Sequence, residues 1–131
     1  MLTLTKFLRT TGPLSARMLQ YTAVTMLGSY MALLVYFSLR PSVPGESGIS
    51  DKVLHFIVYG GLAALWAAAM PRARLISVMV GVSLVGVGLE IAQGMFGENR
   101  SASVLDQIAN MAGALCMLLV WAEVRKRLLK N

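Results

Sequence analysis

The chain has 131 residues, of which 56% are hydrophobic and only 14% are charged. Soluble domains average about 25% charged residues, so this composition argues against a soluble globular protein. The low charge and high apolar fraction exclude an intrinsically disordered chain, and the single cysteine excludes a disulfide scaffold. The length allows one domain, and the remaining class is a small membrane protein.

The formal net charge is +6, from 12 basic and 6 acidic residues. An excess of basic residues is found in proteins that bind nucleic acid or anionic lipid, and it also sets membrane topology. Here the basic residues lie between the apolar stretches and at both ends of the chain. We therefore expect membrane lipids as partners and no nucleic acid.

Four stretches are apolar and long enough to cross a bilayer, which takes about 20 residues. Lipid offers the backbone no hydrogen bonds, so each crossing stretch must be helical. We predict an all-α integral membrane four-helix bundle. The expected spans are 21–39, 53–70, 75–96 and 104–121, the last being the weakest because it contains Asp106 and Asn110.

The spans divide the chain into three parts. Residues 1–20 form a cytoplasmic segment that mixes apolar and basic side chains, and both an interfacial helix and a frayed terminus remain open for it. Residues 21–121 form the four-helix domain, and residues 122–131 form a basic cytoplasmic tail. The first apolar stretch exceeds a signal-peptide core and lacks a cleavage site, so we expect it to be retained.

Lysine and arginine are unequally divided between the segments that connect the spans. Cytoplasmic segments are enriched in these residues, so both termini are predicted to be cytoplasmic. Nine such residues fall on that side: Lys6, Arg9, Arg17, Arg72, Arg74, Arg125, Lys126, Arg127 and Lys130. The other side has three: Arg40, Lys52 and Arg100.

Polar residues gather at one end of the expected bundle. Asp51, His55 and Tyr59 are spaced four residues apart, so they share one face of the second helix. Asp106 and Asn110 have the same spacing at the start of the fourth helix. Charges inside a bilayer are costly, roughly 2.5–3.5 kcal/mol each on insertion scales. Their grouping predicts a polar pocket at the extracytoplasmic end.

Glu90 and Gln93 of the third expected helix lie at the same membrane level as these residues. Glu90 lies about 9 Å inside the outer end of its span, at 1.5 Å per residue, which is too deep for a helix cap. It needs a cationic partner or must be neutral. The candidate partners are Lys52, His55 and Arg100.

Structural roles compete with a functional pocket. Asp51 is a candidate N-cap of the second helix, and Asp106 suits the positive end of the fourth helix dipole. Lys52 is long enough to reach the headgroups from inside the bilayer. A purely structural polar network therefore remains open beside the pocket.

The motif from Asp51 to Tyr59, D-K-x-x-H-x-x-x-Y, resembles a signature of the VanZ-like family. A later motif resembles its E-x-x-Q…R-x-x-S-x-x-D-x-x-x-N-x-x-G signature, and an S-x-x-P follows the first span as in that family. The later motif comprises Glu90, Gln93, Arg100, Ser103, Asp106, Asn110 and Gly113. The resemblance covers about residues 30–120.

The resemblance implies a small multi-pass protein of the bacterial cytoplasmic membrane. The family is named for a member linked to teicoplanin resistance, so a link to glycopeptide resistance is an expectation that the resemblance alone carries. The residues expected to bind a ligand are Asp51, Lys52, His55, Tyr59, Glu90, Gln93, Arg100, Ser103, Asp106 and Asn110.

The favoured function is binding of an envelope lipid or a cell-wall precursor by its headgroup. Lys52 and Arg100 would meet phosphate or carboxylate groups, and the acids and amides would bind sugar or amide groups. This reading leans away from catalysis, assigns no metal ligands and needs no cofactor. The sequence leaves the oligomeric state open.

Two other functions remain open. A membrane-surface enzyme could use His55, Glu90 and Asp106 as acid and base, or as ligands of a divalent cation. The chain lacks an HExxH motif and a GxSxG elbow, and nothing marks Ser101 or Ser103 as an activated nucleophile. A proton-coupled transporter is less favoured, because the polar residues lie at one end of the spans.

Overall fold

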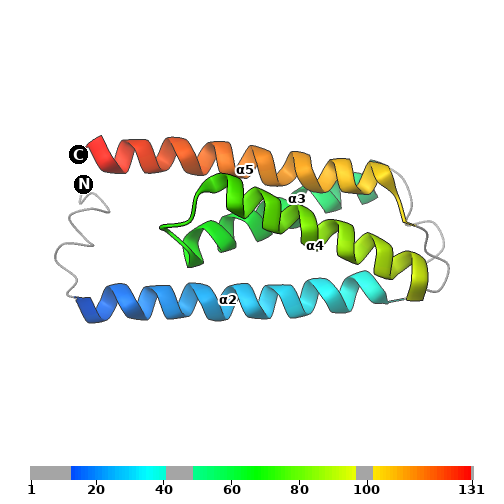
Figure 1. The fold of residues 1–131 in the computed structure, drawn as a ribbon, viewed down its shortest axis with the longest axis horizontal. Coiled ribbons are helices and arrows are strands. Elements are labelled where there is room, and N and C mark those ends of the chain that lie inside the picture. Colours follow the sequence, from blue (N-terminus) through cyan, green and yellow to red (C-terminus); the bar gives the residue numbers. More distant parts are fainter. Residues whose placement is uncertain (1–12, 41–48, 97–101, 131) are drawn as a thin grey trace.

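The computed structural model describes residues 13–40, 49–96 and 102–130. Four α-helices account for nearly all of these residues, and no strand occurs within them. The helices are α2, Pro13–Leu39; α3, Ile49–Ala69; α4, Leu75–Phe96; and α5, Val104–Lys130 (Figure 1). The predicted all-α fold is confirmed.

All four helices are long and apolar enough to cross a membrane, which confirms the number of spans predicted from the sequence. Their apolar segments are Arg17–Leu39, Asp51–Ala69, Leu75–Phe96 and Val104–Arg127. α2 begins at Pro13, so residues 13–20 are its first turns, whereas residues 1–12 lie outside the described part of the chain. The basic residues after Trp121 continue α5 to Lys130.

Prolines mark the ends of two helices. α2 begins at Pro13, where the missing N–H costs nothing because the first turn of a helix has no acceptor for it. α3 ends at Ala69, since Pro71 disfavours the helical conformation at the residue before it. The backbone N–H of Ala73 donates to the carbonyl of Met70 at 2.9 Å and closes the turn to α4.

The helices run alternately up and down, and α3 and α4 lie between α2 and α5 (Figure 1). α3 packs against all three other helices, and most extensively against α5. Glycines allow this approach: a Cβ on Gly60 would lie 3.3 Å from the carbonyl oxygen of Gly113. A Cβ on Gly113 would overlap the backbone carbonyl of Phe56. Such close backbone contact is typical of helix pairs in membranes.

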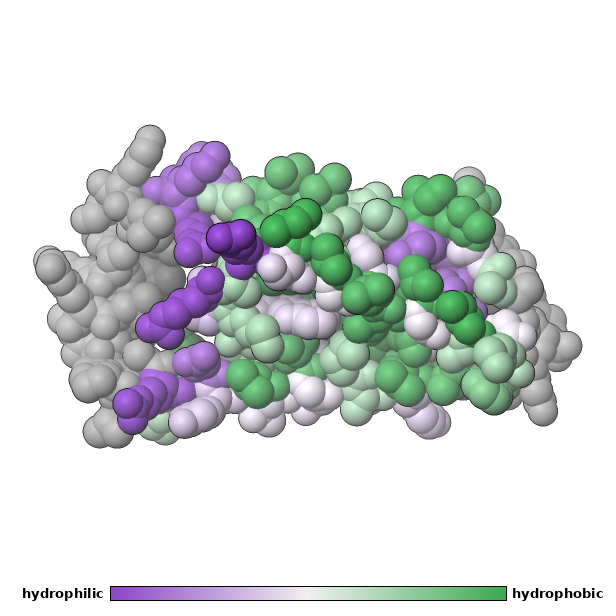
Figure 2. All heavy atoms as spheres, in the orientation of Figure 1, coloured by the Kyte–Doolittle hydropathy of each residue, from purple (hydrophilic) through white to green (hydrophobic). Residues whose placement is uncertain are grey.

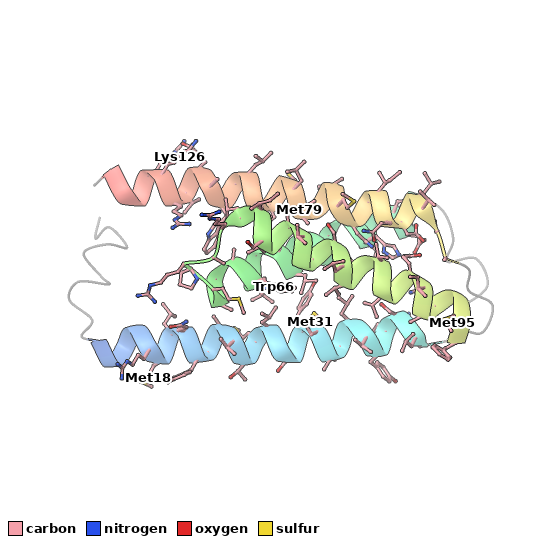
Figure 3. The ribbon with its side chains drawn as sticks, viewed as in Figure 1. Met18, Met31, Trp66, Met79, Met95 and Lys126 are labelled. Atoms are coloured by element: carbon pink, nitrogen blue, oxygen red, sulfur yellow. The ribbon has the colours of Figure 1, made fainter. Side chains whose placement is uncertain are left out.

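The interior is small and the outer surface is largely apolar. Figure 2 shows an apolar band over the middle of the molecule and hydrophilic residues at the end where α2 begins and α5 ends. Met18 and Lys126 lie at that end and Met95 at the other (Figure 3). The buried core consists of Leu34, Tyr59, Leu62, Ala63, Ala67, Val78, Val82, Ala114 and Leu118.

Candidate functional site

Charged side chains of α3 and α5 meet near the N-terminal ends of both helices. Lys52 donates from Nζ to Oδ1 of Asp106, and also to Oδ2 of Asp51 at 3.2 Å. The side chains of Lys52, Asp51 and Asp106 are 34%, 27% and 12% exposed. The two carboxylates thus share one ammonium group, and ion pairs this poorly exposed are less screened than surface pairs.

His55 lies one turn further along α3 and is held from α5. Its Nδ1 lies 2.9 Å from Oδ1 of Asn110. An amide oxygen only accepts, so Nδ1 donates this bond and Nε2 faces the other way. Nε2 lies 3.8 Å from Oδ1 of Asp51 and 3.8 Å from Oδ2 of Asp106. We call Asp51, Lys52, His55, Asp106 and Asn110 the polar cluster.

A chain of amides links the polar cluster to α4. Asn110, which is 1% exposed, donates from Nδ2 to Oε1 of Gln107 at 3.4 Å. Gln107 in turn donates to the carbonyl of Ser83 at 3.3 Å. Gly86 makes room for this chain, because a Cβ there would lie 2.5 Å from Oε1 of Gln107. Gln107 was not among the predicted site residues, although a glutamine inside an apolar span was a visible signal.

Glu90 holds the beginning of α5 through the backbone. Its Oε2 accepts a hydrogen bond from the N–H of Ser103 at 2.8 Å. Ser103 is the N-cap of α5, because its Oγ accepts from the N–H of Asp106 at 3.3 Å. In a capping box an acid three residues after the cap would bind the cap N–H. Here the acid at that position, Asp106, binds Lys52 instead, and Glu90 of α4 accepts the hydrogen bond from the N–H of the cap residue.

Among the described residues, three hydrogen bonds to backbone carbonyls join α2 to the rest of the bundle, and one of them runs from Nε2 of Gln20 to the carbonyl of Ala69 at 3.5 Å. Gln93, which is 5% exposed, donates from Nε2 to the carbonyl of Ser38 at 2.9 Å. Tyr30 donates its hydroxyl to the carbonyl of Val58 at 2.8 Å. The Ser38 carbonyl belongs to the last turn of α2, where carbonyls lack helical partners, so Gln93 satisfies one of them.

Tyr59 lies beside His55 and is almost fully buried. It is 3% exposed, and its ring stacks on the imidazole with a centroid separation of 6.4 Å and an interplanar angle of 21°. Its hydroxyl has no hydrogen-bond partner among the residues that the structure describes. A buried tyrosine hydroxyl normally has a partner, so this group is suited to binding a ligand atom.

An open groove of about 680 Å³ runs between α2 and α3 and reaches the polar cluster. Its apolar part includes Leu33, Leu54 and the ring of Phe37, and the guanidinium carbon of Arg40 lies 5.3 Å from that ring. The full lining consists of Tyr30, Leu33, Leu34, Phe37, Ser38, Arg40, Asp51, Leu54, His55, Val58, Tyr59 and Gln93.

Comparison with known proteins bears on this site. The family model described as VanZ/LLP1 matches residues 8–126 of the chain, which include the first three apolar segments, the fourth up to Lys126, and every residue of the polar cluster. The chain belongs to the VanZ/LLP1 family. No curated protein and no solved structure matches it.

The VanZ/LLP1 motifs thus fall into one connected region. Of the predicted site residues, the five of the polar cluster contact one another directly, and Tyr59 stacks on His55. Glu90, Gln93 and Ser103 lie around them but bind backbone groups. Arg100 and Ser101 lie outside the described residues. The apolar lining from α2 was missed, since Leu33 and Phe37 look like any lipid-facing residues in sequence.

Proposed function

We propose that this VanZ/LLP1 protein binds an amphiphilic envelope lipid, with the headgroup at the polar cluster and the hydrocarbon chain in the groove between α2 and α3. One observation carries the proposal. The groove is continuous from a wall of Leu33, Leu54 and Phe37 to the polar side chains of Asp51 and His55. A lipid has the same order of apolar and polar parts along its length.

The apolar part of the groove is suited to a hydrocarbon chain. Leu33, Phe37 and Leu54 are each more than half exposed, at 57%, 51% and 59%. The groove is open at these exposed side chains, so a lipid could enter it from the bilayer. A hydrocarbon chain in the groove packs against side chains instead of other lipids, so it gains little free energy by leaving the bilayer. Selectivity among lipids must therefore come from the headgroup.

The polar part of the groove selects headgroup chemistry. Arg40 lines this part and brings positive charge that favours a phosphate or carboxylate, and Lys52 lies next to it in contact with Asp51. Asp51 is a pure acceptor when ionised, and the unpartnered hydroxyl of Tyr59 both donates and accepts. A headgroup that carries phosphate together with N–H or O–H groups satisfies both sides. Phosphatidylglycerol, phosphatidylethanolamine and lipid-linked sugar phosphates have this chemistry, and phosphatidylcholine lacks the donors.

We further propose that both termini are cytoplasmic and that the polar cluster lies at the extracytoplasmic side of the bacterial cytoplasmic membrane. The support is the excess of lysine and arginine in the segments at the end where α2 begins and α5 ends. The exposed residues Arg17, Arg72, Arg74 and Lys126 belong to this excess. In this orientation the groove meets lipids of the outer leaflet.

Lipid retention by the purified protein tests the binding proposal. The protein in detergent, with chelator present, is mixed with equal amounts of phosphatidylglycerol, phosphatidylethanolamine and phosphatidylcholine, and bound lipid is counted by native mass spectrometry. We expect the two donor-bearing lipids to be retained several-fold more than phosphatidylcholine. Equal retention of all three would contradict a headgroup site.

Two tryptophan substitutions locate the binding. Leu54→Trp fills the groove and is expected to abolish the preference. Leu84→Trp is the matched control, because Leu84 is similarly exposed at 67% and does not line the groove. It is expected to retain the wild-type preference. If both variants behave alike, the groove is not the binding place.

A link to teicoplanin resistance is a separate proposal that family resemblance alone supports. A deletion strain is compared with the parent for growth in teicoplanin and in vancomycin. We expect the deletion to sensitise cells to teicoplanin, with rescue by the wild type and not by Leu54→Trp. Unchanged sensitivity would remove this proposal while leaving lipid binding intact.

A further inference from the structure

Three side chains of the polar cluster have the composition of a metal site. Asp51, His55 and Asp106 each present one possible ligand atom, and these atoms lie within 4.8 Å of one another. Two carboxylates and one imidazole are ligands that Zn²⁺ accepts, and catalytic zinc sites use three protein ligands with one position open. The three side chains come from two helices that are packed closely at Gly60 and Gly113.

The distances suit coordination after small side-chain rotations. Nε2 of His55 is 3.8 Å from an oxygen of each carboxylate. Ligand atoms of a tetrahedral zinc ion lie about 3.4 Å apart, given metal–ligand bonds of about 2.0–2.2 Å. Each carboxylate oxygen would therefore move about 0.4 Å toward the imidazole. The 3.8 Å separations are too long for hydrogen bonds, so Nε2 binds neither carboxylate, and within the cluster both carboxylates contact the ammonium group of Lys52 instead.

The imidazole is oriented as a metal ligand requires. Metal-binding histidines nearly always donate from the second ring nitrogen to an oxygen, which fixes the tautomer. Nδ1 of His55 makes this bond to Asn110, which is itself 1% exposed and held by Gln107. Nε2 is therefore unprotonated in the neutral ring and faces the carboxylates.

A second observation points to a ligand at the same place. Tyr59 is 3% exposed, its hydroxyl has no partner among the described residues, and its side chain lines the groove beside His55. The groove gives the open coordination position access to a small molecule or headgroup oxygen.

We propose that Asp51, His55 and Asp106 bind a divalent metal ion such as Zn²⁺, and that the ammonium group of Lys52 competes with this ion for the two carboxylates. The two carboxylates carry −2 and Lys52 carries +1, so the three side chains sum to −1 with a neutral imidazole. Lys52 must turn away from Asp106 for the ion to enter, and its flexible stem, 34% exposed, allows that movement. The proposal does not depend on lipid binding.

Direct titration tests the site. Chelator-treated protein in a detergent without phosphate is titrated with Zn²⁺ by calorimetry, and with Co²⁺ while visible absorption reports tetrahedral coordination. We expect one ion per chain and a Co²⁺ spectrum typical of nitrogen and oxygen ligands. Absence of stoichiometric binding by the wild type would overturn the proposal, whatever the lipid experiments give.

Matched variants assign the ligands. Asp106→Asn and His55→Gln keep the side-chain shape and are expected to weaken Zn²⁺ binding at least tenfold. Glu123→Gln is the control, since Glu123 is 54% exposed and pairs with Arg127 away from the cluster, and it should bind Zn²⁺ as the wild type does. Lys52→Met is expected to bind Zn²⁺ more tightly. Unchanged affinity in both ligand variants, or weaker binding in Lys52→Met, would contradict the assignment.

Discussion

The carboxylate of Glu90 on α4 accepts a hydrogen bond from the backbone N–H of Ser103 at the beginning of α5, at 2.8 Å. An acid 7% exposed thus fastens the first turn of the neighbouring helix. That turn carries Asp106, so the bond from α4 sets where α5 presents its carboxylate to Lys52. The deepest acid of the spans is a positioning residue for the polar cluster.

Removing this carboxylate should destabilise the bundle. Glu90→Ala leaves the N–H of the half-buried Ser103 unsatisfied, which costs about 1–3 kcal/mol, and hydrogen bonds to charged groups contribute about 1.5–3 kcal/mol. We expect a loss of about 2–3 kcal/mol, measured by thermal unfolding in detergent. Glu90→Gln retains an acceptor and should lose less.

Glu123→Gln is the control for this change, because it removes an exposed carboxylate and should alter stability by at most about 0.5 kcal/mol. A Glu90→Ala variant as stable as Glu123→Gln would show that the hydrogen bond to Ser103 does not stabilise the fold.

Lys52 and Asp106 should be energetically coupled. Lys52→Met leaves two carboxylates without their ammonium partner, and breaking a partly buried pair is destabilising. Adding Asp106→Asn removes one of those carboxylates, so the double variant should be more stable than the two single losses predict. A double-mutant cycle of unfolding free energies should give a coupling of about 1–3 kcal/mol. Additive losses would mean that the contact is not formed in solution.

The glycine contact between α3 and α5 gives a prediction with an internal control. Gly113→Ala forces a methyl group onto the carbonyl of Phe56, and the helices must separate. We expect loss of about 1–3 kcal/mol or more in thermal unfolding, as in overpacked cores. Gly28→Ala has nothing within 4 Å of the added Cβ and should be neutral or stabilising. Equal losses of stability in Gly113→Ala and Gly28→Ala would contradict a close contact between Gly113 and Phe56.

The orientation can be read by cysteine labelling. In a Cys116→Ser background, Ala102→Cys introduces a thiol at an exposed position just before α5, and Asn131→Cys introduces one at the C-terminus. The excess of basic residues predicts that an impermeant maleimide labels Ala102→Cys on intact cells and labels Asn131→Cys only after lysis. The reverse pattern would place the polar cluster on the cytoplasmic side.

Helical spacing was sufficient to predict the centre of the site. The four-residue repeat of Asp51 and His55, and that of Asp106 and Asn110, put each pair on one helix face. Because polar groups facing lipid are costly, the polar faces of the two helices were expected to meet. They do, through contacts of Lys52 with Asp106 and of His55 with Asn110.

Tertiary geometry was needed for the rest. The partner of Glu90 was expected among Lys52, His55 and Arg100, yet in the described residues it is a backbone N–H, a group that every residue except proline carries and no sequence pattern marks. The groove was equally invisible, because Leu33 and Leu54 have the same composition whether they face bulk lipid or a bound chain.

Site-specific photocrosslinking in native membranes tests the lipid-binding account most directly. A photoreactive phenylalanine is placed at Leu54 in the groove and, in a second protein, at Leu84, which is comparably exposed outside it. Mass spectrometry of the adducts then gives the lipid classes at each position. We predict that the Leu54 adducts are enriched in one headgroup class, that Asp51→Asn removes the enrichment, and that the Leu84 adducts match the bulk membrane. Bulk lipid composition at both positions would contradict the account.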